Sequence, residues 1–191
     1  MSSNSSPAVP GSSIADPGVL GLAGFALTTF VLSLANSGIV PAAGAAVLGL
    51  ALFYGGIAQL LAGMWEFVKG NTFGALAFTS YGAFWLGFWY LVSTGGDKAA
   101  GANGVGAFLL AWTIFTLYMT VASFKASRIV NLVFIALSLT FIFLTAGAFN
   151  GSADATHIGG YLGLLTAALA WYGSAAGVIN STWKKTVLPV G

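Results

Sequence analysis

Long apolar stretches constrain the fold of this chain more than any other feature. A helix that crosses a lipid bilayer needs about 20 mostly apolar residues. The chain offers six such stretches, at residues 18–35, 40–66, 76–93, 104–124, 129–149 and 157–179. Only 5% of the residues are charged, against about 25% in an ordinary soluble domain. The sequence therefore predicts an all-α membrane protein with six transmembrane helices per subunit.

The basic residues predict how these helices are oriented. Six spans place both termini on one side of the membrane, and only Lys98 of the six basic residues falls on the other side. The remaining five are Lys69, Lys125, Arg128, Lys184 and Lys185. Because cytoplasmic loops carry the excess of Lys and Arg, we expect both termini of a plasma or inner membrane protein to be cytoplasmic. The alternative is five spans with residues 71–93 re-entrant, which would separate Lys184 from Lys69.

The segments outside the spans leave room for a single domain. Residues 1–15 are rich in Pro and Ser and have neither a basic residue nor an apolar core, which argues against a signal peptide and predicts a disordered tail. We expect residues 16–185 to form the six-helix transmembrane domain. Residues 186–191 form a short C-terminal tail.

Composition excludes several classes of function. Without cysteine the chain has no disulfide, thiolate metal site or cysteine nucleophile. A net charge of +2 is too small for a nucleic-acid surface. No acid pair, metal cluster or nucleophile–base set is visible, so we expect neither an enzyme nor a cofactor. His157, the only histidine, is interpreted either as a pH sensor or as a helix-end residue with a structural hydrogen bond.

Neutral polar side chains at membrane depth are the main functional signal. They are Thr28, Thr29, Gln59, Thr79, Ser80, Tyr81, Asn131, Ser138 and Thr140. A polar group in hydrocarbon costs several kcal/mol unless it is satisfied, so these residues either hold helices together or line a path for a polar solute. The only acid in the spans is Glu66, near a span end, which argues against a buried carboxylate relay. Neutral donors suit a small anion or a neutral acid.

Three of these side chains each allow two interpretations. Gln59 offers two donors and one acceptor, and it either binds a carboxylate in the path or bridges two helices. Tyr81 either gates the path or anchors its helix at an interface. Thr28 either lines the path or bonds back to a carbonyl of its own helix.

The connection between the second and third spans also has two interpretations. Gly70 is a suitable C-cap, and Asn71 or Thr72 can cap the next helix. Glu66 and Lys69, three residues apart on one helix face, can pair. A broken helix here would leave free N–H groups as an anion site, whereas an ordinary cytoplasmic turn would have no such role.

Several stretches resemble the acetate uptake transporter family, also called succinate–acetate permeases. The strongest is the run from Phe53-Tyr54-Gly55-Gly56 to Phe84-Trp85, and residues 125–128 and 186–191 also match. The N-terminal signature of the family reads Asn-Pro-Ala-Pro-Leu-Gly-Leu. The corresponding residues here are Asp16-Pro17-Gly18-Val19-Leu20-Gly21-Leu22. The resemblance covers nearly all of residues 16–191.

The resemblance implies a six-helix subunit in a ring-shaped hexamer, in which each subunit has its own path. It implies transport of acetate, and in some members of succinate. It also implies a constriction formed by Phe25, Tyr81 and Leu137. The acid at position 16 departs from the family signature. Asp caps a helix as well as Asn does, but its charge would repel an incoming anion unless a lysine pairs with it.

The sequence is thus interpreted as a transporter or channel for acetate and related small carboxylates. The predicted path and substrate-binding residues are Leu20, Phe25, Thr28, Gln59, Tyr81 and Leu137. With no buried acid, we expect the proton to travel on the substrate as acetic acid. Channel-like flow of the anion is the alternative mechanism. The expected partners are the carboxylate, the lipid bilayer and further copies of the chain, which the resemblance implies assemble as a hexamer. The alternative is a non-transporting membrane sensor or assembly scaffold.

Overall fold

The structure is a computed structural model that describes residues 14–191. The first 13 residues of the predicted disordered tail lie outside the described residues. The elements, in chain order, are α1 (Pro17–Asn36), α2 (Ala43–Leu52), the π-helix η1 (Phe53–Ala58), α3 (Gln59–Lys69), α4 (Thr72–Ser93), α5 (Gly96–Ser123), α6 (Arg128–Asn150) and α7 (Ala153–Trp183).

Within residues 14–191, six helices are long and apolar enough to cross a membrane, which confirms the six-span prediction. One of the six is composed of α2, η1 and α3, which follow one another without a break and form a single continuous helical span over Ala43–Lys69. Residues 71–93, which the five-span alternative made re-entrant, instead contain the complete 22-residue helix α4. That alternative is therefore wrong.

The fourth span begins earlier than its apolar stretch. The apolar stretch predicts a start at residue 104, but α5 starts at Gly96 and includes a kink at Gly101, whose φ is +62° and ψ is −175°. The polar run that looked like a loop has Asp97 in the first helical turn, where a carboxylate interacts favourably with the free N–H groups. Hydropathy alone misses such a turn because its residues are polar.

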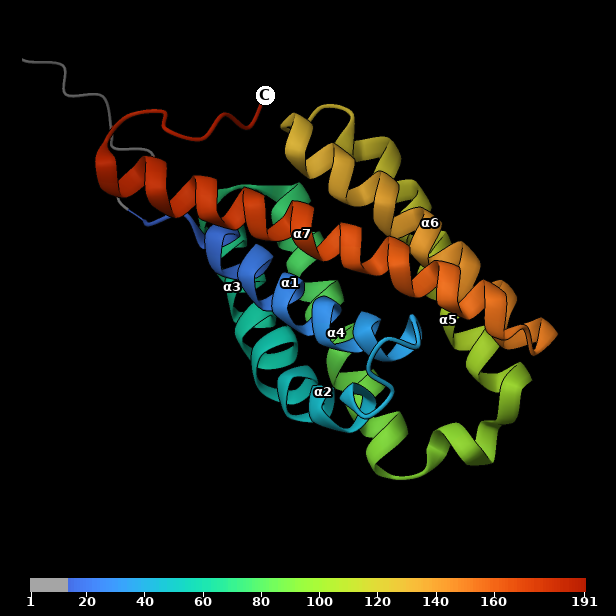
Figure 1. The fold of residues 1–191 in the computed structure, drawn as a ribbon. Helices are drawn as coiled ribbons and strands as arrows, with labels where there is room; N and C mark the ends of the chain where they lie inside the picture. The colour runs from blue at the N-terminus through green and yellow to red at the C-terminus, as the bar shows by residue number, and fades with distance from the viewer. Residues whose placement is uncertain (1–13) are drawn as a thin grey trace, which may run out of the picture.

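The helices form a bundle in which α7 lies alongside both α1 and α6 (Figure 1). The helix α5 packs on the other side of α6, and α3 packs against α4. The C-terminal tail turns back over the bundle (Figure 1), where the Ile129 N–H donates to the carbonyl of Val190 at 3.1 Å. Residue 14 and the C-terminus therefore lie at the same end of the bundle, as an even number of spans requires.

Glycine allows the first helices to approach one another closely. A Cβ atom built at Gly24 of α1 would lie 2.6 Å from the carbonyl oxygen of Tyr54 in η1. One built at Gly55 would lie 2.6 Å from the hydroxyl of Thr28. Small residues at such contacts are how membrane helices gain packing without a hydrophobic driving force. The glycine-rich composition is thus used within the subunit.

Hydroxyl groups link α5, α6 and α7 across their interfaces. Each of these side chains lies at membrane depth, and each finds a partner on the neighbouring helix. The pairs are Thr113–Thr145 at 2.9 Å, Thr120–Ser138 at 2.7 Å and Thr140–Thr166 at 3.3 Å. Two members of the polar set that the sequence singles out, Ser138 and Thr140, therefore hold helices together.

Candidate functional site

Two cavities enter the bundle from opposite ends. The proximal cavity, at the end that carries the C-terminus, has a volume of about 540 Å³ and extends inward from the neighbourhood of Asp16 and Lys125. The distal cavity has a volume of about 480 Å³ and extends inward from the neighbourhood of Asp97 and Lys98. Among the described residues, the side chains that line both cavities are Phe25, Tyr81 and Leu137.

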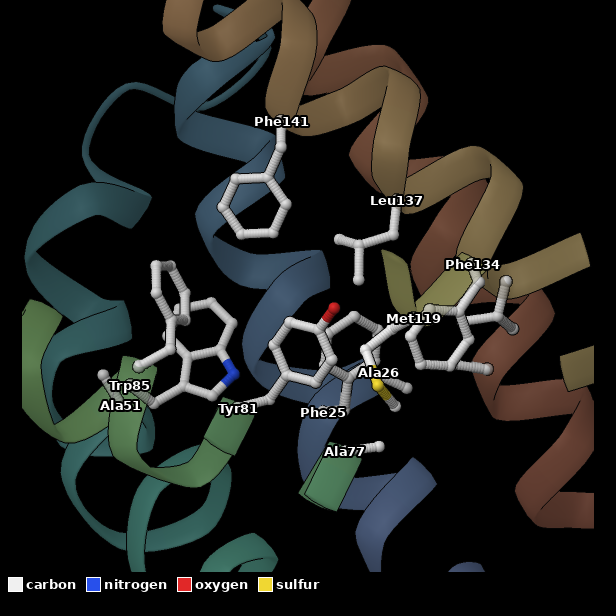
Figure 2. Close-up of a cluster of buried hydrophobic side chains, with 13 residues drawn as sticks. Phe25, Ala26, Ala51, Ala77, Tyr81, Trp85, Met119, Phe134, Leu137 and Phe141 are labelled. Atoms are coloured by element: carbon white, nitrogen blue, oxygen red, sulfur yellow. The ribbon is translucent and has the colours of Figure 1, made fainter. Parts of the chain in front are cut away.

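These three side chains, from here on called the collar, come from α1, α4 and α6. They are almost fully buried, with 5%, 3% and 4% of their surfaces exposed. The rings of Phe25 and Tyr81 lie 5.8 Å apart between centroids, and Figure 2 shows Leu137 reaching from α6 toward Tyr81. The structure thus brings together the three residues that the family resemblance selected, at the point where the cavities meet.

The hydroxyl of Tyr81 has a partner inside the bundle. Its oxygen lies 2.9 Å from the Thr116 hydroxyl, while the Thr116 hydroxyl also lies 2.8 Å from the Trp112 carbonyl and donates to it. A threonine hydroxyl has a single proton, so Tyr81 donates to Thr116. The Tyr81 oxygen keeps lone pairs that accept hydrogen bonds, and the collar offers a solute an acceptor rather than a donor.

Gln59 lines the proximal cavity just below the collar. It is the first residue of α3, directly after the π-helix η1, and single π-turns of this kind occur often at functional sites. Its side chain is buried, and its carbonyl oxygen has no hydrogen-bond partner among the described residues. An unsatisfied buried acceptor costs about 1–3 kcal/mol, which a bound donor would recover. The Gln59 carbonyl oxygen therefore makes no hydrogen bond to a neighbouring helix within residues 14–191, and its contact with a solute stays a prediction.

Glu66 departs from the sequence expectation. The sequence predicts it near a span end, where the structure has it, and its spacing permits a pair with Lys69. Instead its side chain is buried and lines the proximal cavity, and its Oε2 accepts a hydrogen bond from Asn71 Nδ2 at 2.9 Å. Lys69 turns to Asp16, where its Nζ donates to Oδ1 at 2.7 Å. The spacing on the helix permitted the expected pair, but the acid that caps α1 competes for the same lysine.

The turn between α3 and α4 has the caps that the sequence predicts. Gly70 adopts a left-handed conformation with a φ of +78°, which glycine adopts without the steric cost of a Cβ atom. Asn71 caps α4 by accepting from the Gly74 N–H at 3.2 Å. This turn lies at the proximal mouth, where Lys69, Asn71 and Gly74 line the cavity.

The distal cavity contains polar groups without partners. The indole nitrogen of Trp85 and the hydroxyl of Thr29 are buried without a hydrogen-bond partner among the described residues, and both side chains line this cavity. Figure 2 shows the Trp85 nitrogen turned toward Tyr81. The distal side of the collar therefore provides donors, which the collar itself does not.

Two of the predicted path residues lie elsewhere. Leu20 is 41% exposed on the outer surface of α1 and lines neither cavity. Thr28 is fully buried, lines neither cavity and donates to the carbonyl of Gly24 at 2.8 Å, as the structural interpretation of this residue predicted. His157 also lines neither cavity, and its ring lies next to Gly38.

Sequence reasoning gave no specific role in the path to four residues that the structure places in the cavities or next to the collar. Trp85 looks like ordinary core, Thr29 is one member of the neutral polar set without a distinct role, and Thr116 shows no signal that links it to Tyr81. Glu66 did carry a signal, since it is the only acid within the predicted spans and ionisable groups at membrane depth are usually functional.

The chain is similar to proteins that are described as transporters. The model of the GPR1/FUN34/yaaH family matches residues 2–191. The succinate-acetate/proton symporter SatP of Escherichia coli is 41% identical over 181 residues, which cover 93% of this chain and 96% of that protein. Acetate permease A of Emericella nidulans is 40% identical over 195 residues, which cover 92% of this chain and 65% of the permease.

A solved structure gives the same result in three dimensions. It is described as the structure of the bacterial acetate channel SatP, and it matches this chain with a TM-score of 0.87 at 40% sequence identity. The match covers 93% of this chain and 99% of the other. The similarity therefore extends over the helices that form the collar and both cavities.

Proposed function

Because this chain belongs to the GPR1/FUN34/yaaH family, we propose that it carries acetate and related small carboxylates, succinate among them, across the membrane. The single observation that carries the proposal is that cavities from opposite ends of the bundle meet at one collar of three side chains. A sensor or an assembly scaffold needs no such pair of cavities.

The chemistry of the collar favours the protonated acid as the species that crosses it. Phe25 and Leu137 are apolar, and the Tyr81 hydroxyl is an acceptor because its proton is engaged by Thr116. A carboxylate would lose its water there without gaining a donor, which is costly for an ion. A carboxylic acid can donate its O–H to Tyr81 while its methyl group contacts the apolar side chains. We therefore propose that the proton crosses the collar on the substrate.

The polar groups on either side of the collar support the proposal that the protonated acid crosses it. The unpartnered donors of Trp85 and Thr29 suit a carboxyl group that arrives in the distal cavity. The unpartnered carbonyl oxygen of Gln59 suits the O–H of an acid that has passed the collar. Both arrangements match the donor and acceptor inventory of a carboxylic acid.

Orientation and assembly belong to the same proposal. The proximal end carries Lys69, Lys125 and Arg128, so the excess of basic residues favours a cytoplasmic position for this end and for both termini. Reporter fusions at the C-terminus that read extracytoplasmic would contradict this.

We propose a homo-hexamer, and native mass spectrometry of the detergent-purified protein would contradict it by showing only monomers.

Uptake of labelled acetate into proteoliposomes tests the proposed function. Protein-free liposomes are the control, since acetic acid itself permeates lipid. We expect protein-dependent uptake that rises as the external pH falls toward the acid's pKa of about 4–5, with competition by propionate and succinate. Uptake no faster than in protein-free liposomes would favour the sensor or scaffold.

A further inference from the structure

Glu66 is a carboxyl group that the proposed transport path has not yet used. It lies on α3, within the span Ala43–Lys69, and only 1% of its surface is exposed. It lines the proximal cavity. A carboxylate at such a place is expensive unless it has a function or a full set of partners.

The partners of Glu66 do not neutralise it. Asn71 donates one hydrogen bond to Oε2, and the sole ion pair found within residues 14–191 joins Lys69 to Asp16. The charged groups that line this cavity together with Glu66 are therefore Asp16 at the start of α1, Lys69 on its own helix, and Lys125. The helix α4 contributes no ionisable group to this cavity apart from Tyr81 at the collar.

The surrounding glycines make room for this carboxyl group. A Cβ atom at Gly18 would lie 3.2 Å from Glu66 Oε1, and one at Gly74 would lie 2.9 Å from its Cδ. Asn71 meanwhile fixes the other carboxyl oxygen. One oxygen is thus held by the turn, while the carboxyl group as a whole borders the cavity.

Glu66 and Gln59 follow each other along the cavity wall. They are seven residues apart on α3, so they share a helix face and are separated by about 10.5 Å along the axis at 1.5 Å per residue. Gln59 is the one nearer the middle of the span, and Glu66 the one nearer the proximal mouth. A substrate that leaves the collar therefore passes the amide first and the carboxyl group second.

We propose that Glu66 is the proton acceptor of the path, a role that rests on the proposed function. The acid that passes the collar transfers its proton to the Glu66 carboxylate, so the substrate O–H bond breaks and a Glu66 O–H bond forms. The substrate is now a carboxylate, which is attracted toward Lys125 at the mouth. Glu66 then releases the proton to water in the cavity. One proton and one carboxylate thus arrive on the proximal side for each acid that crosses.

Glu66→Gln tests this role because the amide keeps the size of the side chain and cannot titrate. Two rates are measured in proteoliposomes: net acetate accumulation driven by a pH gradient, and acetate exchange at equal pH on both sides. We expect exchange to stay within about twofold of the wild type, while accumulation above the protein-free background falls about tenfold or more, as expected on losing a positioned proton acceptor. Glu66→Asp keeps a titrating group and should recover part of the accumulation.

The outcomes separate this proposal from the proposed function. Asp154→Asn is the matched control, because Asp154 is exposed in the first turn of α7, and we expect it to change neither rate. If folded Glu66→Gln loses both rates together, or keeps both, the proton-acceptor role is wrong although transport stands. If the wild type itself shows neither rate, the proposed function fails first.

A second measurement covers the case in which Glu66→Gln does not fold. Infrared difference spectra of the wild type, recorded with isotope-labelled acetic acid, distinguish protein carboxyl bands from those of the substrate. We expect the acid to produce a protein carboxyl band that shifts in Glu66→Asp. A spectrum without such a band would overturn the proposal.

Discussion

Tyr81 and Thr116 share a hydrogen bond of 2.9 Å between α4 and α5, at the point where the two cavities meet. Because the Thr116 hydroxyl donates its hydrogen bond to the Trp112 carbonyl, the Tyr81–Thr116 bond uses the only proton of the tyrosine hydroxyl. The polarity of the collar is thus set by a threonine that lines neither cavity.

Thr116→Val should change which form of the substrate crosses. The substitution keeps the branched shape but removes the acceptor, so the Tyr81 hydroxyl can donate to a carboxylate in the collar. We expect acetate flux to depend less steeply on pH in this variant, with flux near neutral pH higher than in the wild type. Flux across a pH series in proteoliposomes checks this. A pH profile identical to that of the wild type would contradict the role of Thr116.

Tyr81→Phe should slow transport without changing the size of the collar. The ring stays, but the acceptor for the acid's O–H is lost, at a cost of about 1 kcal/mol, or about fivefold in rate. Thr116 keeps its bond to Trp112, so the bundle should remain folded. The measurement is the initial rate of acetate uptake together with competition by lactate. A gain in lactate transport would show that Tyr81 limits size instead.

Leu137→Ala should widen the collar. The removed side chain is 4% exposed and borders both cavities, so its loss joins them through a larger opening. We expect faster acetate flux and admission of bulkier acids such as lactate, together with a loss of stability of about 2–5 kcal/mol. Leu139→Ala is the matched control, since Leu139 lies two residues further along α6 and is 41% exposed. Equal substrate range in the two variants would show that Leu137 is ordinary core.

Hydropathy predicted the spans well because a bilayer imposes one requirement on every helix that crosses it. Each span must be long and apolar, and that property is visible in a single sequence. The caps of the α3–α4 turn were also predictable, since Gly70 acts through its own backbone conformation and the Asn71 side chain accepts from a backbone N–H only three residues on. The predicted helix boundaries were wrong where polar residues extend a helix beyond its apolar stretch, as Asp97 does at the start of α5.

The site was less predictable because its contacts join distant parts of the chain. Nothing in the neighbourhood of Lys69 reveals that its partner is Asp16, 53 residues away. The spacing on α3 favoured Glu66 as the partner of Lys69. A Glu66 side chain paired with Lys69 would not be expected to lie buried beside a cavity, so its position in the site was not predicted. Phe25 and Leu137 came only from the family resemblance, because an apolar residue in a membrane helix has the same local pattern whether it lines a path or packs in the core.

Asp16→Asn should raise the affinity of the proximal mouth for carboxylates. The variant restores the amide of the family signature and keeps an N-cap for the Gly18 N–H. It leaves Lys69 without its ion-pair partner, so the mouth becomes more positive. We expect the KM for acetate entering from the proximal side to fall about two- to fivefold at low salt, the range given by an exposed pair worth up to about 1 kcal/mol.

Salt provides the check on this prediction, because screening weakens interactions between exposed charges. The difference between Asp16→Asn and the wild type should shrink as ionic strength rises. Asp154→Asn, at the opposite end of the bundle, should leave the proximal KM unchanged. A KM that changes equally at low and high salt would indicate a change in cavity shape rather than in charge.

Gly24→Ala should destabilise the bundle next to the collar. A Cβ atom there would lie 2.6 Å from the Tyr54 carbonyl oxygen, which belongs to the backbone of η1 and cannot turn aside as a side chain can. We expect a loss of about 1–3 kcal/mol from overpacking, seen as a lower melting temperature in detergent. Gly49→Ala is the control, since nothing lies within 4 Å of a Cβ atom at that position and alanine favours the helix by up to about 1 kcal/mol.

Because η1 precedes Gln59 directly, Gly24→Ala should also impair acetate uptake by the fraction that remains folded, whereas Gly49→Ala should not. Equal melting temperatures for the two variants would mean that α1 and η1 can separate without consequence, and that the π-helix does not hold Gln59 in place.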